Sequence, residues 1–494
     1  LEASLELIAD GVVEGMQDMG AAGISCSTSE MSAKGETGMR IDLDLVPLRE
    51  EGMSAYEIML SESQERMLLV VIPDLIPRVE AICSKWDLPV TRIGETTDDG
   101  ILEVLRGGIV VARIPAESLV LGGGAPVYER EWKQAAYVDD ARAEDPHALI
   151  GDVDVIDAFN LLIESPNIAS KRWVYEQYDS MVRTITVQSF ASDAAVVRLK
   201  EIEGTAIALS TDCNSRYVYL NPYVGAMIAV AEAARNVVCT GALPVAITNC
   251  LNFGNPYNPE VFWQFREAIR GMGDACRRLN TPVTGGNVSF HNESQERAVF
   301  PTPTIGMLGV IDDVAHITPS GFQAEGDEVA LLGFERFELG GSELLSQRCG
   351  KVVGDAPALD IEEEVRLQAA LLEAIRSGAI QSAHDCSEGG LAIALAECAI
   401  NSVGALGVDA EYRRDDVIGA LFGESQSRIV ISYNPASRDA ISQIASRHNV
   451  PLTTLGNVVR DRFRLNEIEL LVGALAARYN GAIERIMVRE SMAL

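Results

Sequence analysis

Apolar and polar residues alternate in ways that predict mixed helices and strands over the first hundred residues. Apolar residues between Leu5 and Val12 recur at the spacing of one helix face. The stretch from Arg40 to Leu45 alternates like a half-buried strand, and the apolar run from Met67 to Ile72 predicts a short buried strand. A helix over Ile76 to Trp86 and a strand through Val90 are expected to follow.

The middle of the chain has a similar mixture with longer helices. Apolar runs predict strands over Ala206 to Leu209 and over Pro244 to Ile247. Helical periodicity predicts a mostly apolar helix from Tyr223 to Val238 and an amphipathic one from Pro259 to Arg278. This pattern is typical of an α/β domain.

A polar and glycine-rich phrase occurs twice in the chain, in the same order and with nearly the same spacing. The first copy comprises residues 18–24 (DMGAAGI), 62–68 (ESQERML) and 89–94 (PVTRIG). The second comprises residues 385–391 (DCSEGGL), 424–430 (ESQSRIV) and 451–456 (PLTTLG). The period is far too long for a solenoid, so the duplicated unit is predicted to be a whole domain.

The duplication predicts a B–A–B′ arrangement that combines α/β and α+β domains. The first B domain is expected over residues 1–120, a glycine-rich linker over 121–144, the A domain over 145–318 and the second B domain over 319–494. A duplicated A–B pair implies another A domain ahead of residue 1, and the chain opens on leucine. We therefore expect a fragment that lacks its first A domain.

Composition narrows the possible partners. The chain has 40 basic and 72 acidic residues and a formal net charge of −32, which argues against sequence-independent nucleic-acid binding. There is no apolar run long enough to cross a bilayer and no signal-peptide pattern at the first residues, so no membrane partner is expected. Nine scattered cysteines without a Cys-x-x-Cys pair indicate reduced thiols and a cytoplasmic protein.

The unduplicated middle segment has the densest polar signal. Residues 248–256 (TNCLNFGNP) and 282–290 (PVTGGNVSF) each follow a predicted strand. Paired glycines let backbone N–H groups approach a phosphate, Asn287 offers a carbonyl oxygen to a hard cation, and Ser289 offers a hydroxyl to a ligand. The alternative is an ordinary Gly-Gly-Asn turn.

Five further positions in the repeated phrases have two interpretations each. Asp18 and Asp385 precede glycine-rich turns that open helices, where a carboxylate caps the helix or binds Mg²⁺. Glu62, Ser63 and Gln64 precede a buried strand, and they either bind a ligand or form an ordinary turn.

One helix of the middle segment and two histidines remain ambiguous. Glu232 and Asn236 are four residues apart on a mostly apolar helix and share a face, either as a solvated edge or as a metal site. His291 and His384 lack an obvious nucleophile partner, so a structural role is favoured for both. No P-loop and no dinucleotide-binding Gly-x-Gly-x-x-Gly motif occurs.

Together these phrases resemble the small form of the formylglycinamide ribonucleotide amidotransferase family, whose domains share the aminoimidazole ribonucleotide synthetase-like (PurM-like) fold. The resemblance covers essentially the whole chain. Its marks are residues 17–23 (QDMGAAG), 61–66 (SESQER), 252–256 (NFGNP), 284–289 (TGGNVS) and 384–391 (HDCSEGGL). Any one of them is weak, but five in order are specific.

The resemblance implies a role for each matching residue. Substrate contacts are implied for Glu62, Ser63, Gln64 and Ser289; ATP contacts for Asn249 and Gly286; and Mg²⁺ ligands for Asp18 and Asn287. Asn249 stands where many relatives have aspartate. A secondary nucleotide and Mg²⁺ site, as in large relatives, is implied at Asp179, Glu232, Asn236 and Asp385.

The implied reaction is the ATP-dependent amidation of formylglycinamide ribonucleotide in purine biosynthesis. Its cofactors are ATP and Mg²⁺, and its ammonia comes from a glutaminase subunit recruited with a small bridging subunit. The family's catalytic histidine lies in the first A domain, so no catalytic residue is assigned here and this chain alone is expected to be inactive. The alternative is a nucleotide-binding scaffold or regulator with the same fold.

Overall fold

The computed structural model describes residues 1–63, 65–188, 192–295 and 297–491. The chain divides into two compact units, Leu1–Glu129 and Arg130–Leu494, which are described separately. Among the described residues, none of the helices combines the length and the apolar content that crossing a bilayer requires.

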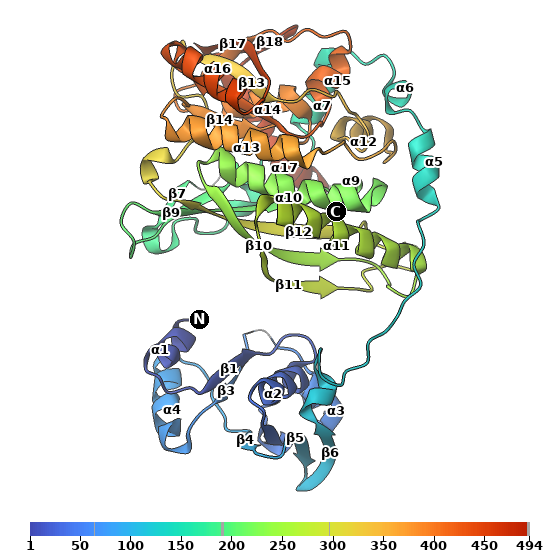
Figure 1. The fold of residues 1–494 in the computed structure, drawn as a ribbon, viewed down its shortest axis with the longest axis vertical. Helices are drawn as coiled ribbons and strands as arrows, with labels where there is room; N and C mark the ends of the chain where they lie inside the picture. Colours follow the sequence, from blue (N-terminus) through green and yellow to red (C-terminus); the bar gives the residue numbers. More distant parts are fainter. Residues whose placement is uncertain (64, 189–191, 296, 492–494) are drawn as a thin grey trace. The chain divides into compact units, whose positions relative to one another are not determined.

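The first unit consists of two small sheets and four α-helices (Figure 1). Its helices are α1 (Glu2–Ala9), α2 (Gly23–Lys34), α3 (Ala55–Leu60) and α4 (Ile76–Lys85). Its strands are β1 (Gly15–Asp18), β2 (Gly38–Asp42), β3 (Met67–Val70), β4 (Gly94–Thr97), β5 (Ile101–Arg106) and β6 (Ile109–Pro115). Strands β1 and β3 pair with each other, and the second sheet has the order β4-β2-β5-β6. Ile24, Ile41, Ile58 and Leu68 join both sheets in one apolar core.

The structure confirms the helix over residues 76–86 and corrects two strands of this unit. The strand that begins at residue 38 ends at Asp42, because the Asp42 carboxylate accepts the Asp44 N–H and starts a 3₁₀ turn. The strand predicted through Val90 is wrong. Leu88 and Val90 are exposed, and the strand that pairs with β2 begins only at Gly94.

The second unit begins with short helices and then forms a six-stranded mixed sheet of order β11-β10-β12-β9-β8-β7. The helices are α5 (Tyr137–Ala143), α6 (Pro146–Ile150), α7 (Val155–Ile163), α8 (Arg172–Tyr175), α9 (Ser215–Leu220), α10 (Pro222–Cys239) and α11 (Pro259–Leu279). The strands are β7 (Thr186–Gln188), β8 (Ala195–Arg198), β9 (Ala206–Asp212), β10 (Leu243–Asn252), β11 (Val283–Ser289) and β12 (Thr302–Ile311). The two strands and two long helices predicted for this region are confirmed.

Helix α10 is buried on all sides. One side packs on α11 and on strands β9 and β12, and the other packs on elements of the second copy, α13 (Ile361–Arg376) and β14 (Ser382–Asp385). Val238 and Cys239 at its end belong to the same apolar cluster as Leu371. A helix that is apolar all round needs such two-sided burial, so its few polar side chains face protein rather than water.

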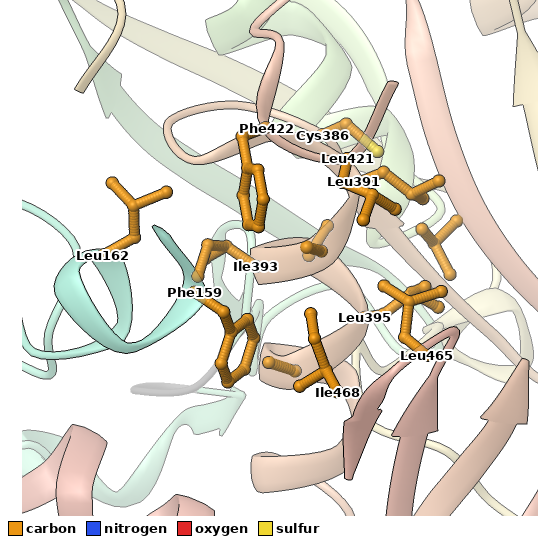
Figure 2. Packing of buried hydrophobic residues seen from close by; sticks show 14 of the residues in the cluster. Phe159, Leu162, Cys386, Leu391, Ile393, Leu395, Leu421, Phe422, Leu465 and Ile468 are labelled. Atoms are coloured by element: carbon orange, nitrogen blue, oxygen red, sulfur yellow. The ribbon is translucent and has the colours of Figure 1, made fainter. Parts of the chain in front are cut away.

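The second copy of the duplicated unit has a seven-stranded sheet of order β14-β16-β13-β17-β15-β18-β19. Its remaining helices are α12 (Glu343–Cys349), α14 (Gly390–Ile400), α15 (Val417–Phe422), α16 (Arg438–Arg447) and α17 (Val472–Ser491). Its remaining strands are β13 (Glu328–Gly333), β15 (Leu406–Ala410), β16 (Arg428–Tyr433), β17 (Leu452–Arg460), β18 (Arg462–Leu465) and β19 (Ile468–Leu471). Figure 2 shows α14 packed against Phe159 and Leu162 of α7. Cys386 is fully buried in this core, as a small apolar residue would be.

In both copies of the repeated phrase, a helix begins at a glycine with a positive φ angle. Gly23 opens α2 and Gly390 opens α14, both with positive φ angles, of 51° and 67°. A Cβ atom on Gly23 would lie 2.2 Å from the Ser61 carbonyl oxygen, and one on Gly390 would lie 2.5 Å from that of Gly423. Each helix start therefore lies directly against the residue that precedes the Glu-Ser-Gln sequence, which brings the two halves of the phrase together.

Candidate functional site

Asp18 lies at the end of β1, exposed, immediately before the turn that opens α2. The capping interpretation is not realised. The residue that caps α2 is Ala22, in the left-handed conformation, and the one that caps α14 is Gly389; within the described part of the chain neither helix receives a side-chain cap. Asp18 therefore does not cap the helix, and its carboxylate accepts a hydrogen bond from the Gln17 amide at 3.3 Å.

The two described residues of the first Glu-Ser-Gln sequence are accessible. Glu62 is exposed and Ser63 half-buried in the segment between α3 and β3, while Gln64 lies outside the described residues. Arg66 turns back and donates to the Ser61 carbonyl, which fixes the start of the segment. The Glu62 side chain is thus at the surface of this unit, and that of Ser63 is partly accessible.

The Gly-Gly-Asn sequence of the middle segment is a strand, so the turn interpretation is wrong. Strand β11 runs parallel to β10 at the sheet edge, with Gly286 beside Asn249. A Cβ atom on Gly286 would lie 2.1 Å from the Asn249 Oδ1 atom, so only glycine fits there. Asn287 is exposed on the strand, and the Ser289 hydroxyl donates to Asn292 Oδ1 at 3.2 Å. An edge strand also presents unpaired backbone groups, which suit a phosphate or an adenine.

The second Glu-Ser-Gln sequence is buried and satisfied by the protein itself. Glu424 accepts hydrogen bonds from the Tyr217 hydroxyl, from Gly389 N at 2.8 Å and from Glu343 N at 2.8 Å. Ser425 accepts from a backbone N–H, and Gln426 accepts from Arg235 at 2.9 Å. Glu62 and Ser63 are therefore accessible in the first copy, whereas Glu424 and Ser425 are buried and hydrogen-bonded within the fold in the second.

Arg235 is the central cation of this buried region. Its side chain is fully buried on α10, and its guanidinium contacts Glu364 at 2.8 Å, Asp385 at 3.4 Å and Glu232 at 3.4 Å. These contacts raise its pKa even though burial opposes it. The burial of Glu232 rules out the solvated-edge interpretation of the Glu232 and Asn236 pair.

Several more buried carboxylates lie near Arg235, and together they exceed its single positive charge. Asn236 donates to Asp212 at 3.2 Å. Burial, together with repulsion from Glu388 and Asp385, raises the pKa of Asp212 well above its usual range. Burial and repulsion from Asp212 do the same for Glu232. Mutually repelling carboxylates around an amide oxygen are a donor set that suits a divalent cation.

Asp193 is a further member of this region that sequence reasoning missed. Its side chain is 3% exposed and pairs through Oδ1 with His384 Nδ1. Its other oxygen, Oδ2, is buried and has no hydrogen-bond partner among the described residues. Ligand atoms of Asp193, His384 and Asp385 lie within 4.8 Å of one another. The residue lies just after a segment without periodicity, so the sequence offered no signal for it.

Asp179, by contrast, is not brought into this group. It lies in an exposed segment, where its carboxylate accepts the Met181 N–H at 2.7 Å. Of the four secondary-site residues expected from the resemblance, the structure brings together Glu232, Asn236 and Asp385. We name these three with Asp193 and Asp212 the acidic cluster. Its orphaned buried oxygen and its carboxylates fit Mg²⁺.

His384 is held from both sides by carboxylates. Nδ1 faces Asp193, and Nε2 lies 3.1 Å from Glu397 Oε2. Burial alone would lower the pKa of His384, but Asp193 and Glu397 raise it well above its ordinary value. The other ambiguous histidine, His291, has no place in the acidic cluster; its ring lies 6.3 Å from that of Tyr257.

Comparison with known families assigns both kinds of domain. Residues 191–311 match the family described as AIR synthase related protein, N-terminal domain. Residues 1–106 and 324–466 both match AIR synthase related protein, C-terminal domain. The expected PurM-like fold class, with α/β and α+β parts and one domain type that precedes and follows the other along the sequence, is therefore confirmed.

Curated relatives match along nearly the whole chain. Phosphoribosylformylglycinamidine synthase subunit PurL of Chlorobium chlorochromatii is 49% identical over 99% of this chain and 66% of its own length. The PurL subunit of Salinibacter ruber is 51% identical over 98% of this chain and 66% of its own length. That of Chlorobaculum tepidum is 47% identical over all of this chain and 67% of its own length. The chain thus spans about two thirds of the length of these relatives.

Solved structures give the same result. Thermotoga maritima PurL complexed with ATP aligns with a TM-score of 0.65 and 25% identity, covering 93% of this chain and 66% of that one. The same protein complexed with FGAR aligns with a TM-score of 0.66 and 27% identity, covering 93% and 64%. The chain belongs to the family of phosphoribosylformylglycinamidine synthase subunit PurL.

Proposed function

We propose that the chain carries part of the active site that converts formylglycinamide ribonucleotide to formylglycinamidine ribonucleotide in purine biosynthesis. ATP transfers its γ-phosphoryl group to the amide oxygen of the substrate, ammonia attacks the activated carbon, and phosphate leaves. The observation that carries the proposal is the contrast between the two Glu-Ser-Gln sequences. The second is buried and satisfied by the fold, whereas Glu62 and Ser63 are available for a ligand.

Each open residue has a role in this proposal. Glu62, Ser63 and Gln64, with the Ser289 hydroxyl, bind the substrate. Asn249 and Gly286 form the ATP contact, where the missing Cβ atom leaves room for the Asn249 side chain. Asp18 and Asn287 hold Mg²⁺, which neutralises charge on the transferred phosphoryl group.

The ammonia source and the assembly follow from the relatives. A solved PurLQS complex from Thermotoga maritima aligns with a TM-score of 0.63 and 25% identity. We propose that this chain likewise works with a glutaminase subunit and a small bridging subunit. Its own substrates would be small molecules and ATP, consistent with a formal net charge of −32 that disfavours nucleic acid.

The acidic cluster supports a second proposal, that it binds Mg²⁺ and a nucleotide as a structural site. Asp193, Glu232 and Asp385 would supply carboxylate oxygens and Asn236 an amide oxygen. The buried Oδ2 atom of Asp193, which has no hydrogen-bond partner within the described part of the chain, supports this assignment. The cation would supply the positive charge that Arg235 alone does not.

The substrate role of Glu62 is tested by steady-state kinetics on the protein expressed from its full gene. The assay contains Mg-ATP, formylglycinamide ribonucleotide and ammonium. Glu62→Gln should lower kcat/KM for formylglycinamide ribonucleotide at least tenfold, because a hydrogen bond to a charged group is worth about 1.5–3 kcal/mol. Glu117→Gln, at another exposed glutamate of the first unit, should change nothing. An unchanged kcat/KM in Glu62→Gln would contradict the assignment.

The same assay separates the enzyme from a nucleotide-binding scaffold. An enzyme releases phosphate and forms amidine when it is given Mg-ATP, formylglycinamide ribonucleotide and ammonium. A wild-type gene product that binds substrate and ATP by calorimetry but releases no phosphate would favour the scaffold.

A further inference from the structure

We infer that His384 is a positioning residue, which holds Asp193 so that one carboxylate oxygen stays free for a cation in the acidic cluster. This inference rests on the Mg²⁺ site proposed above and concerns how that site is kept in shape. It also joins the site to the C-terminal helix α17, through Glu397 and Tyr479.

The ring of His384 is fixed at both nitrogens. Nδ1 contacts Asp193 Oδ1, and Nε2 lies 3.1 Å from Glu397 Oε2. With two opposed carboxylates the ring cannot rotate without losing a partner, and its side chain is only 12% exposed. Because each ring nitrogen faces a carboxylate oxygen, His384 orients a ligand rather than binding the cation itself.

The two carboxylate oxygens of Asp193 differ in their hydrogen bonding. Oδ1 belongs to His384, while Oδ2 is buried and unpaired among the described residues. A buried carboxylate oxygen without a hydrogen-bond partner costs free energy, and a bound cation would remove that cost. Fixing one oxygen and presenting the other is how neighbouring groups orient metal ligands.

Glu397 is anchored in turn by the last helix. The Tyr479 hydroxyl on α17 donates to Glu397 Oε1 at 2.9 Å, and α17 packs against α14, which carries Glu397. Burial, with Glu397 nearby, raises the pKa of Tyr479, so the hydroxyl stays a neutral donor. The contacts therefore run in series from Tyr479 to Glu397, His384 and Asp193.

The test measures Mn²⁺ binding to the 494-residue chain by electron paramagnetic resonance, with and without ADP. The parent protein in this test carries Asp18→Asn, which removes the proposed cation ligand of the first copy. Every other variant carries this substitution as well. The parent should bind Mn²⁺, and Asp193→Asn should abolish the bound signal. His384→Phe should weaken binding at least about tenfold, as loss of an orienting group typically does.

Two variants separate positioning from a general structural role. His384→Asn keeps an N–H donor near the Nδ1 position and should bind within about threefold of the parent. His448→Phe removes a histidine that is likewise paired with a carboxylate, at 2.7 Å from Glu373 but outside the acidic cluster, and should bind like the parent. If His384→Phe does not fold, Glu397→Gln replaces it, with an expected weakening of about threefold or more.

The outcomes distinguish the two proposals. If the bound Mn²⁺ signal of the parent is absent, or is the same in Asp193→Asn, the cation site is refuted and this inference with it. A parent that binds, with His384→Phe and Glu397→Gln binding equally tightly, would overturn the positioning role alone. Weakening in His384→Phe and recovery in His384→Asn support it.

Discussion

Removing the charge of Arg235 should destabilise the second unit more than any surface charge does. The substitution Arg235→Met keeps a long apolar side chain but leaves Glu364, Asp385 and Glu232 without their shared cation. All three carboxylates are buried, so none of them can recover full hydration.

The expected magnitude follows from this geometry. Breaking a buried ion pair by removing one partner costs about 3–5 kcal/mol. Glu364 keeps the Ser427 hydroxyl and the Gln368 amide, which places the loss within that range rather than above it. At about 2 °C per kcal/mol for a large unit, the melting midpoint should fall by about 6–10 °C.

The assay is thermal unfolding followed by far-ultraviolet circular dichroism in EDTA, so that no added cation replaces the guanidinium. Arg413→Met is the matched control. Arg413 is 61% exposed on the same unit and also pairs with two glutamates, and its loss should leave the midpoint unchanged. Adding Glu364→Gln to Arg235→Met should recover part of the loss. A midpoint of Arg235→Met equal to that of Arg413→Met would refute the reasoning.

Three further predictions concern single positions. Burial raises the pKa of Glu424 to about 7, so the folded state keeps a proton that the unfolded chain releases near pH 4.3; the stability this proton confers is complete at low pH and is lost as pH rises towards 7. Urea unfolding should therefore show that Glu424→Gln lacks about 3 kcal/mol of the stability that the wild type loses between pH 4 and pH 7; equal losses would contradict the assignment. Gly390→Ala should cost about 2–4 kcal/mol in urea unfolding, because φ is 67° and the new Cβ atom would lie 2.5 Å from the Gly423 oxygen. Gly404→Ala, with φ of 86° and open space, should cost only about 1–2 kcal/mol, and equal losses would show that the contact is unimportant. Gly286→Ala should lower ATP affinity at least about tenfold by calorimetry, since its Cβ atom would displace the Asn249 side chain, whereas Gly285→Ala has open space and should bind normally.

The sequence predicted the elements that depend on local periodicity. The long helices α10 and α11 and the paired copies of the repeated phrase are where the apolar pattern places them. The strand through Val90 failed because alternation alone does not say whether a face is covered, and in the structure Leu88 and Val90 are exposed.

The candidate site was only partly predictable for the same reason. Asp385 and Glu232 belong to recognisable phrases, but Asp193 precedes β8 in a stretch without any pattern. Only the pairing of distant segments places it beside His384. The sequence also could not say which Glu-Ser-Gln copy is buried, because that depends on Tyr217 and Arg235 from the middle segment.

The two-sided burial of α10 has a consequence for how the second unit opens. A helix that serves two cores at once cannot detach from one without exposing the other. The middle segment and the second copy should therefore unfold as one cooperative block despite their separate sheets. In native-state hydrogen exchange, the amides of α10 should share one opening free energy with those of α13 and β14, and that value should be the largest in the unit.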